Sequence, residues 1–205
     1  CDHGRLGAYM LQTGLCERVL LTDLSGASLE KARRLVSMLG LASRARFLVG
    51  DGADALAEKP DVAAIAGMGS RTIAGIVLRG RAKLRHARLV LQPNVDAPEL
   101  RLALMNAGYA IADERIARDG RRLYPIIAAV PGQARYDETQ LTVGPVLVMR
   151  RPEELRDYAR FRVRVAKKAL SGMESAGATG TTGADDAAMR RELGIWEEVA
   201  EWRSG

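Results

Sequence analysis

Residues 18–52, "RVLLTDLSGASLEKARRLVSMLGLASRARFLVGDG", contain two short apolar runs separated by an amphipathic stretch. Two segments have the apolar composition of buried strands, "RVLLTD" (18–23) and "ARFLVGDG" (45–52). Each segment carries an acid near its end. Between them, residues 28–40 place apolar side chains at helical spacing and finish with Gly40, which is typical of a glycine-capped helix. A strand–helix–strand unit of this kind predicts parallel strands in an α/β fold.

The same alternation continues to about residue 109. We expect strands at 61–69 and 87–94 and helices at 72–80 and 97–109, and the strand "DVAAIAGMG" (61–69) is apolar enough to be covered on both faces. The rhythm then changes, because residues 110–130 contain two strand patterns around the turn dipeptide Asp119-Gly120. These patterns predict a mostly parallel, doubly wound Rossmann-like sheet with an antiparallel terminal hairpin.

The last third of the chain predicts a pair of helices. Pro152, followed by two acids, opens an amphipathic helix that we expect to end near Gly172. The Gly/Thr/Ala-rich stretch 175–184 is typical of a mobile loop, and residues 185–202 form a second helical pattern. We therefore expect an antiparallel helical hairpin over residues 150–205 and an α/β domain over residues 1–149.

Composition restricts the class of protein. Apolar residues make up 47% and charged residues 27% of the 205, which indicates a soluble globular chain, and no apolar run reaches the ~18 residues of a membrane span. Two cysteines and two histidines are too few for a protein-built metal centre. We expect a cytoplasmic protein, monomeric, with no metal and no membrane partner, while its net charge of +6 favours a polyanionic partner.

Acids and glycines stand where three strands meet their helices. Asp2, His3 and Gly4 form a turn before a helical pattern, and the free backbone amides of such turns point at a ligand. Asp23 follows Gly4 by 19 residues, which is the spacing of an acid that binds ribose hydroxyls. Asp51 ends the next strand, where an adenine amino group is an expected partner. Each acid alone is more often a loop or helix cap, but together they favour a nucleoside cofactor.

Two adenosine cofactors then remain, NAD and S-adenosylmethionine. Hydride transfer with NAD usually needs a catalytic domain or a placed His, Lys or Tyr, and the sequence offers none. The fourth strand ends in "IAGMGS" (65–70), a loop with little side-chain chemistry and much room. Such a loop suits a reaction that depends on alignment, and methyl transfer from an already activated sulfonium is one. We therefore expect S-adenosylmethionine.

The sequence resembles the bacterial tRNA (adenine(22)-N(1))-methyltransferase family in four segments, "CDHGRLGAYML" (1–11), "GDGADAL" (50–56), "AIAGMGSRTI" (64–73) and "LVLQPNVDAPELRLAL" (89–104). The resemblance covers most of residues 1–150, and "AGMG" followed one strand later by "LQPN" is its specific part. It implies a class I methyltransferase domain and a helical, coiled-coil-like, RNA-binding extension. The family often has a second glycine after "AGMG", where this chain has Ser70.

The resemblance also implies which residues hold the methyl donor. Asp2, His3 and Gly4 would lie against its methionine part, with His3 shaping the pocket, Asp23 on the ribose, and Asp51 with Gly52 on the adenine. The full set expected at the cofactor is Cys1, Asp2, His3, Gly4, Asp23, Leu24, Asp51, Gly52, Ala66, Gly67 and Met68.

The target base is expected at the next loop. Gln92, Pro93 and Asn94 would face it, together with Gly69. Adenine N1 attacks through an in-plane lone pair and gives a cationic product, so no general base is required. We expect Gln92 and Asn94 to recognise the base edge and Asp2 to oppose the developing charge, which makes these three the candidate catalytic residues.

Three basic clusters predict contact with RNA. They are residues 79–88, the hairpin segment "RDGRR" (118–122) with Arg121, and a stripe on the first tail helix. The stripe consists of Arg156, Arg160, Arg164 and Lys167. A basic stripe is usually a solvated helix face, but the agreement in sign of all three clusters favours tRNA as the partner.

The turn at Asp2–Gly4 lacks the strand that precedes such turns. By resemblance we expect about 15–25 residues upstream of Cys1, which would contain that strand and a helical lead-in.

Two other functions stay open. One is a class I methyltransferase that acts on another RNA or a small molecule, and the other is an RNA-binding module with a degenerate cofactor pocket. Only the resemblance names position 22 of tRNA.

Overall fold

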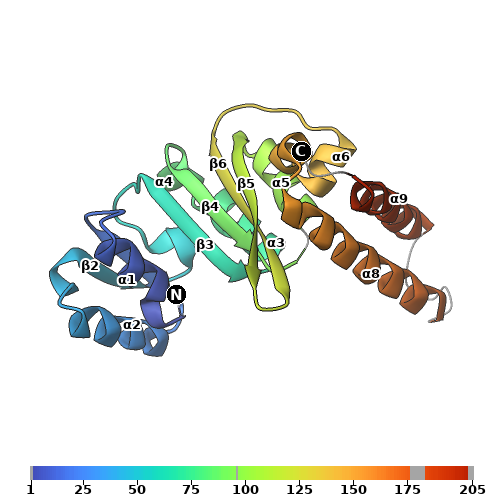
Figure 1. Cartoon of the computed structure of the whole chain (residues 1–205). Helices are drawn as coiled ribbons and strands as arrows, with labels where there is room; N and C mark the ends of the chain where they lie inside the picture. The colour runs from blue at the N-terminus through green and yellow to red at the C-terminus, as the bar shows by residue number, and fades with distance from the viewer. Residues whose placement is uncertain (1, 96, 176–182, 203–205) are drawn as a thin grey trace. The chain divides into compact units, whose positions relative to one another are not determined.

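The computed structural model describes residues 2–95, 97–175 and 183–202 (Figure 1). The chain divides into two compact units. The first unit comprises Cys1–Ala63 and Ala74–Ala87, and the second comprises Ala64–Ile73 and Arg88–Gly205. Within the described ranges, no helix has both the length and the apolar character needed to cross a membrane.

The first unit is built around two parallel strands. β1 (Val19–Asp23) and β2 (Ala45–Val49) pair in register from Val19 with Ala45 to Asp23 with Val49, so the predicted strand–helix–strand unit is confirmed. Its helical elements are η1 (Asp2–Gly4), α1 (Arg5–Gln12), α2 (Gly26–Met38), η2 (Ala42–Arg44), η3 (Gly52–Ala55), α4 (Arg81–Leu84) and the end of α3 (Ser70–Arg79). Leu11, Leu21, Leu29, Ala32 and Val36 are buried in its core.

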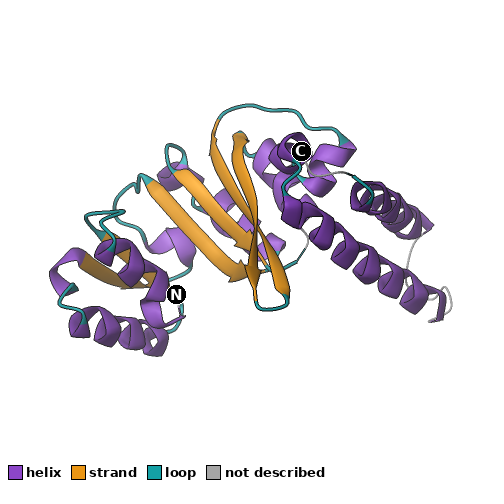
Figure 2. Ribbon diagram, in the orientation of Figure 1, coloured by secondary structure: helices purple, strands orange, loops and turns teal. Residues whose placement is uncertain are grey.

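The second unit contains a four-stranded sheet in the order β3-β4-β6-β5 (Figure 2). Its strands are β3 (Val62–Met68), β4 (Arg88–Pro93), β5 (Tyr109–Asp119) and β6 (Arg122–Pro131), and α5 (Ala97–Asn106) joins β4 to β5. β5 and β6 are antiparallel around the predicted Asp119-Gly120 turn. The predicted α/β class with an antiparallel terminal hairpin is confirmed, and its strands pair as two sheets, β1-β2 and β3-β4-β6-β5.

Strand β3 is less buried than its sequence predicts. We expected cover on both faces, but every residue of β3 is exposed or half-buried. β3 is the outermost strand in the order of its sheet, so it has a neighbouring strand in that sheet on one side only. The prediction was wrong because an apolar composition does not by itself show that both faces of a strand are covered.

The tail folds as the predicted pair of helices, α8 (Glu153–Ser175) and α9 (Gly183–Ala200). They pack side by side (Figure 1). Between them, the Tyr158 ring lies edge-on to the Trp196 ring, with centroids 5.6 Å apart. A buried cluster joins both helices to β5 through Ile116, Leu155 and Val199. α8 continues through Gly172, where we expected it to end, because burial of its apolar face outweighs the cost of one internal glycine. Of the loop predicted at 175–184, residues 176–182 lie outside the described residues.

Two short helices were not predicted, α6 (Glu138–Val143) and α7 (Pro145–Arg150). Asp137 caps α6 through a reciprocal pair of hydrogen bonds with Gln140. Gly144 joins the helices at a φ of 122°, and a Cβ at this position would overlap the Glu114 carboxylate. The left-handed backbone and the close carboxylate together explain why glycine occupies this corner.

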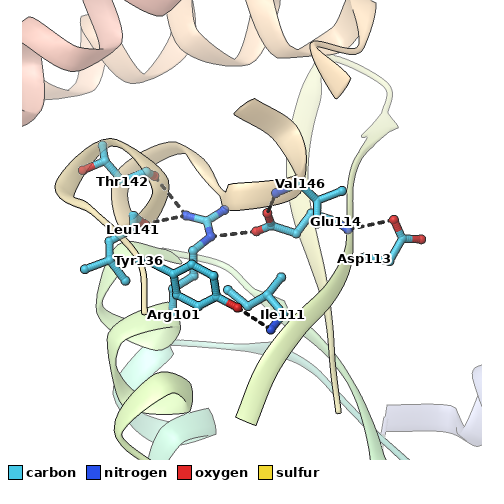
Figure 3. Close-up of polar contacts among 8 residues, drawn as sticks. All are labelled: Arg101, Ile111, Asp113, Glu114, Tyr136, Leu141, Thr142 and Val146. Atoms are coloured by element: carbon cyan, nitrogen blue, oxygen red, sulfur yellow. Dashed lines mark hydrogen bonds and ion pairs between the residues drawn. The ribbon is translucent and has the colours of Figure 1, made fainter. Parts of the chain in front are cut away.

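A buried ion pair holds the corner between α6 and α7 (Figure 3). Arg101 Nε donates to Glu114 Oε1 at 2.7 Å, and both side chains are 1% exposed. Arg101 Nη1 also donates to the carbonyls of Leu141 and Thr142 at the end of α6, while Glu114 Oε2 accepts from the amide of Val146 at the start of α7. Each charge therefore sits at the helix end whose dipole it stabilises.

Candidate active site

The carboxyl ends of β1 and β2 lie side by side, which brings Asp23 and Asp51 to one edge of the first sheet. Asp23 is the last residue of β1, and its carbonyl accepts from the amide of Gly50 at 3.0 Å. Asp51 follows at once, and Gly52 begins η3. Leu24, beside Asp23, is exposed. The two acids thus lie at the same edge, as expected from parallel strands.

Both carboxylates also have structural partners. Asp23 Oδ1 accepts from the amide of Ser25, which is itself the N-cap of α2, at 2.8 Å. Asp51 Oδ2 pairs with Arg79 Nη2 at 2.6 Å, and Arg79 also contacts Asp54 at 3.3 Å. Both side chains of the Asp51–Arg79 pair remain half-exposed. The capping role that the sequence left open is therefore present at Asp23, whereas Asp51 makes no side-chain cap and pairs with Arg79. Both acids stay partly exposed at the edge.

The turn η1 is tightly packed against α2. His3 and Gly4 have φ values of 57° and 61°, in the left-handed region. A Cβ on Gly4 would lie 2.6 Å from Cβ of Ala32, so a larger residue does not fit. Cys1 lies outside the described residues, as does the side chain of Asp2, and their roles stay predictions.

In the second unit, three hydrogen bonds join the "AGMGS" loop to the loop after β4. The Asn94 amide donates to the Met68 carbonyl at 2.8 Å, so β3 and β4 end at the same edge. The Gly67 amide donates to Gln92 Oε1 at 2.9 Å. Ser70, which is 1% exposed, donates from Oγ to the Val95 carbonyl at 2.6 Å. The serine found where the family often has glycine thus fixes the loop that carries Asn94.

The other predicted residues of these two loops differ in how far they are exposed to solvent. Ala66 and Met68 are exposed, Gly69 is half-buried and Pro93 is buried. Pro93 is therefore placed to shape the backbone of the loop rather than to contact a base through its ring.

Gln92 and Asn94 are not equivalent, although the sequence treats both as candidates for reading the base. Gln92 Oε1 accepts from Gly67, so its Nε2 must point the other way, where it donates to the Pro93 carbonyl at 3.0 Å and to Asn94 Oδ1 at 3.1 Å. This fixes the amide of Asn94 with its oxygen toward Gln92. Asn94 is exposed, and its Nδ2 makes no hydrogen bond to another described residue. Gln92 is thus the internal partner and Asn94 the available donor.

Asn94 also lines a groove of about 690 Å³ whose other walls are the β5–β6 hairpin and α8. The apolar part of the lining is Leu123, Tyr124 and Phe161. Among the described residues that line it, Asp157 is the one acid, and the basic residues are Arg118, Arg121, Arg122, Arg160 and Arg164. We call this site the groove. All of its residues belong to the second unit.

The arginines of the groove differ in their partners. Arg118 pairs with Asp157 at 2.6 Å and so ties the hairpin to α8, while the guanidinium of Arg122 contacts the Tyr124 hydroxyl. Arg121, Arg160 and Arg164 make no ion pair with any described residue. The charges of these three arginines are therefore not paired with any described carboxylate, and they attract a polyanion.

The structure divides the basic stripe predicted on α8. Arg160 and Arg164 line the groove, but Arg156 Nη2 donates to the Trp202 carbonyl at 3.2 Å, and Lys167 pairs with Glu197 at 2.8 Å. Those two residues hold the second tail helix against the first. Helical spacing placed all four on one stripe, but it gave no signal about partners on α9. Arg118, Arg122 and Phe161 were missed as single residues because only the fold brings them to Asn94.

Solved structures of methyltransferases share this architecture. The crystal structure of the B. subtilis m1A22 tRNA methyltransferase TrmK matches with a TM-score of 0.84 at 24% identity, over 98% of this chain and 89% of that one. M. capricolum TrmK, in complex with S-adenosyl-homocysteine, matches with a TM-score of 0.79 at 17% identity, over 98% of this chain and 88% of that one. The fold is that of a Rossmann-like methyltransferase.

Sequence comparison identifies the family. The family model described as TrmK, tRNA (adenine(22)-N(1))-methyltransferase, matches residues 1–191, and the chain belongs to this family. The curated tRNA (adenine(22)-N(1))-methyltransferase of Bacillus subtilis is 32% identical over 147 residues. That match covers 70% of this chain and spans 62% of the length of the B. subtilis protein.

Proposed function

We propose that this protein transfers a methyl group from S-adenosylmethionine to N1 of an adenine in tRNA, at position 22 by its family. The observation that carries the proposal is Asn94, whose amide is held with its donor available in a groove lined by arginines. Membership of the TrmK family supports the same reaction.

The adenosine part of the cofactor is assigned to the sheet edge of the first unit. Asp23 and Asp51 are accessible acceptors at one sheet edge, which fits the hydroxyl and amino donors of an adenosine. Leu24 and Gly52 directly follow Asp23 and Asp51, and His3 and Gly4 belong to the separate turn η1. The parts proposed for Ala66, Gly67 and Met68, which belong to the second unit, stay predictions from the family. S-adenosylmethionine would supply a methyl group on an already activated sulfonium. Arg79 pairs with Asp51 at 2.6 Å, so the arginine orients that carboxylate.

The target base is assigned to the second unit. Adenine N1 uses its lone pair to form the new N–CH₃ bond, and no proton has to leave N1 first. The residues therefore need to orient the ring rather than deprotonate it, and alignment alone contributes up to ~7–11 kcal/mol in well-oriented reactions. Asn94 Nδ2 is the proposed donor to the base edge, with Gln92 and Ser70 as positioning residues. Gly69 and Pro93 shape the loop, and Asp2 is proposed to oppose the charge of the product.

The groove is the proposed contact with tRNA. An adenine within folded tRNA must be unstacked before its N1 is reached, at a cost of a few kcal/mol. Attraction between tRNA phosphates and Arg121, Arg160 and Arg164 offsets part of that cost. Residues 150–205 are proposed as the RNA-binding extension, and the monomeric state and cytoplasmic location stay predictions.

Unmodified tRNA incubated with the protein and labelled S-adenosylmethionine tests the reaction directly. We expect label on a single nucleoside, N1-methyladenosine, at position 22. Label at another nucleotide would mean that the protein is an RNA methyltransferase of a different class. No label, combined with no binding of S-adenosylhomocysteine in calorimetry, would leave only an RNA-binding module.

A further inference from the structure

Phe161 is an exposed aromatic ring in a groove that is otherwise positively charged. It lies on α8, is 40% exposed, and lines the groove together with Tyr124 of β6. A single exposed phenylalanine needs no explanation by itself. Its position among Arg160, Arg164 and Arg121 is informative, because the groove then offers an apolar ring and basic groups to one ligand.

The ring of Phe161 is supported from behind. Its centroid lies 6.3 Å from that of Tyr158, and Tyr158 is buried edge-on against Trp196. Tyr158 is tied into the core that joins the two tail helices. Phe161 is therefore fixed by packing on one side and accessible on the other, which is how an aromatic platform is pre-organised for stacking.

The chemistry of the groove fits one class of ligand. Proteins that hold single-stranded nucleic acid combine aromatic faces for the bases with basic side chains for the backbone. The volume of about 690 Å³ lies within the ~300–1,000 Å³ range of sites that enclose small ligands. It therefore leaves room for an unstacked nucleotide. An acidic peptide would satisfy the arginines but would leave the ring without a partner.

We propose that the groove binds an unstacked nucleotide of the tRNA next to the target adenine, with its base stacked on Phe161 and its phosphates at Arg121, Arg160 and Arg164. The inference deepens the proposed function, on which it rests for the identity of the RNA. Asn94 lines the same groove as Phe161, so the sites proposed for the target adenine and for its neighbour belong to one groove. Stacking then holds the strand open on one side of the target.

The test compares variants of Phe161 in the intact protein. The probe is a short single-stranded oligoribonucleotide with 2-aminopurine beside the target adenine, whose fluorescence is quenched on stacking. Phe161→Leu keeps an apolar side chain but removes the aromatic face, and we expect it to weaken binding roughly tenfold, within the range for loss of one stacked base. Phe161→Trp restores an aromatic face, and we expect it to restore affinity and quenching.

Val165→Ala is the matched control, because Val165 is 41% exposed on the same helix and does not line the groove. We expect it to bind as the wild type does. The proposal is overturned if Phe161→Leu binds and quenches like Val165→Ala, or if a duplex or an acidic peptide binds as tightly as the single strand. Thermal unfolding of each variant shows whether the fold has survived.

Failure of the proposed methyl transfer and failure of the nucleotide site give different experimental results. If the wild type never methylates tRNA but quenches the probe through Phe161, the reaction is wrong and the nucleotide site stands. If methyl transfer occurs and Phe161→Leu changes neither quenching nor KM for tRNA, the reaction stands and the nucleotide site is wrong.

Discussion

The second unit has two regions rich in polar side chains, the corner between α6 and α7 and the groove beside α8. The two regions differ in where these side chains find hydrogen-bond and ion-pair partners. In the corner, Arg101 and Glu114 are buried and find their partners inside the protein. In the groove, Arg160, Arg164 and Asn94 are exposed, and each keeps donors with no partner among the described residues. The difference teaches that charge alone does not indicate function, because the paired charges of the corner hold the fold while the unpaired charges of the groove remain available to a ligand. Variants in the corner should therefore change stability, and variants in the groove should change binding and turnover.

The largest effect is expected from breaking the buried pair. Arg101→Ala leaves Glu114 buried without its counter-charge, and loss of one partner of such a pair costs about 3–5 kcal/mol. Urea unfolding measures this loss. A loss of stability below about 1 kcal/mol would show that water reaches Glu114 in the variant. Burial of the ion pair would then not be the feature that distinguishes the corner from the groove.

The double variant Arg101→Met with Glu114→Leu is the control. It removes both charges together, so we expect most of the lost stability to return. Arg101 Nη2 is buried with no hydrogen-bond partner among the described residues, which is a further reason why the apolar pair is tolerated.

The next effect concerns turnover. Asn94→Ala removes the one side-chain donor that Gln92 holds toward the groove, and we expect kcat/KM for tRNA methylation to fall about 10²-fold, as for loss of one orienting contact. The free energy of unfolding should stay within about 0.5 kcal/mol because Asn94 is exposed. A variant that turns over normally would remove Asn94 from the site.

Gln92 provides the matched comparison. Gln92→Ala frees the Asn94 amide to rotate without removing it, so we expect a smaller loss than for Asn94→Ala. Gln92→Glu should be worse than Gln92→Ala, because the new carboxylate attracts Asn94 Nδ2 and turns the donor away from the groove. The opposite order would contradict a positioning role.

The sequence predicts those features of the molecule that depend on residues close together in the chain. Strands β1, β2 and β4 and helix α2 were predicted because their apolar patterns are local. Helices α6 and α7 were not, because six residues carry little periodicity and their stability comes from Arg101 and Glu114, which are distant in the chain. Family resemblance indicated the two loops with Asn94 and Gln92, but their unequal roles depend on one hydrogen bond to Gly67. The groove needed the fold, because residues 94, 118–124 and 157–164 meet only there.

A smaller effect separates arginines that share one stripe of α8. Arg160→Gln and Arg164→Gln should each reduce the slope of log affinity for single-stranded RNA against log salt by about 0.7, because each removes one phosphate contact. Arg156→Gln and Lys167→Gln are the matched controls, since these side chains already bind Trp202 and Glu197. Equal changes in all four slopes would mean that the whole stripe contacts RNA and that internal pairing does not distinguish its members.

The smallest effect tests the exposed rim of the corner by pH. Burial raises the pKa of Asp113, but the hydrogen bond and charge of Arg150 outweigh it, so the pKa lies below its usual value of 3.8. The folded state therefore favours the ionised carboxylate, and its contribution to stability is present above about pH 4 and is lost as the pH falls through the folded pKa. Arg150→Gln should cost less than about 1 kcal/mol at pH 7, since both side chains are partly exposed. Its unfolding curve should converge with that of the wild type in acid. If the difference in stability between the variant and the wild type instead persists at low pH, the Arg150 side chain stabilises the corner by packing and not by its charge. Asp113 would then resemble neither the buried pair, which acts through charge, nor the groove, which acts through binding.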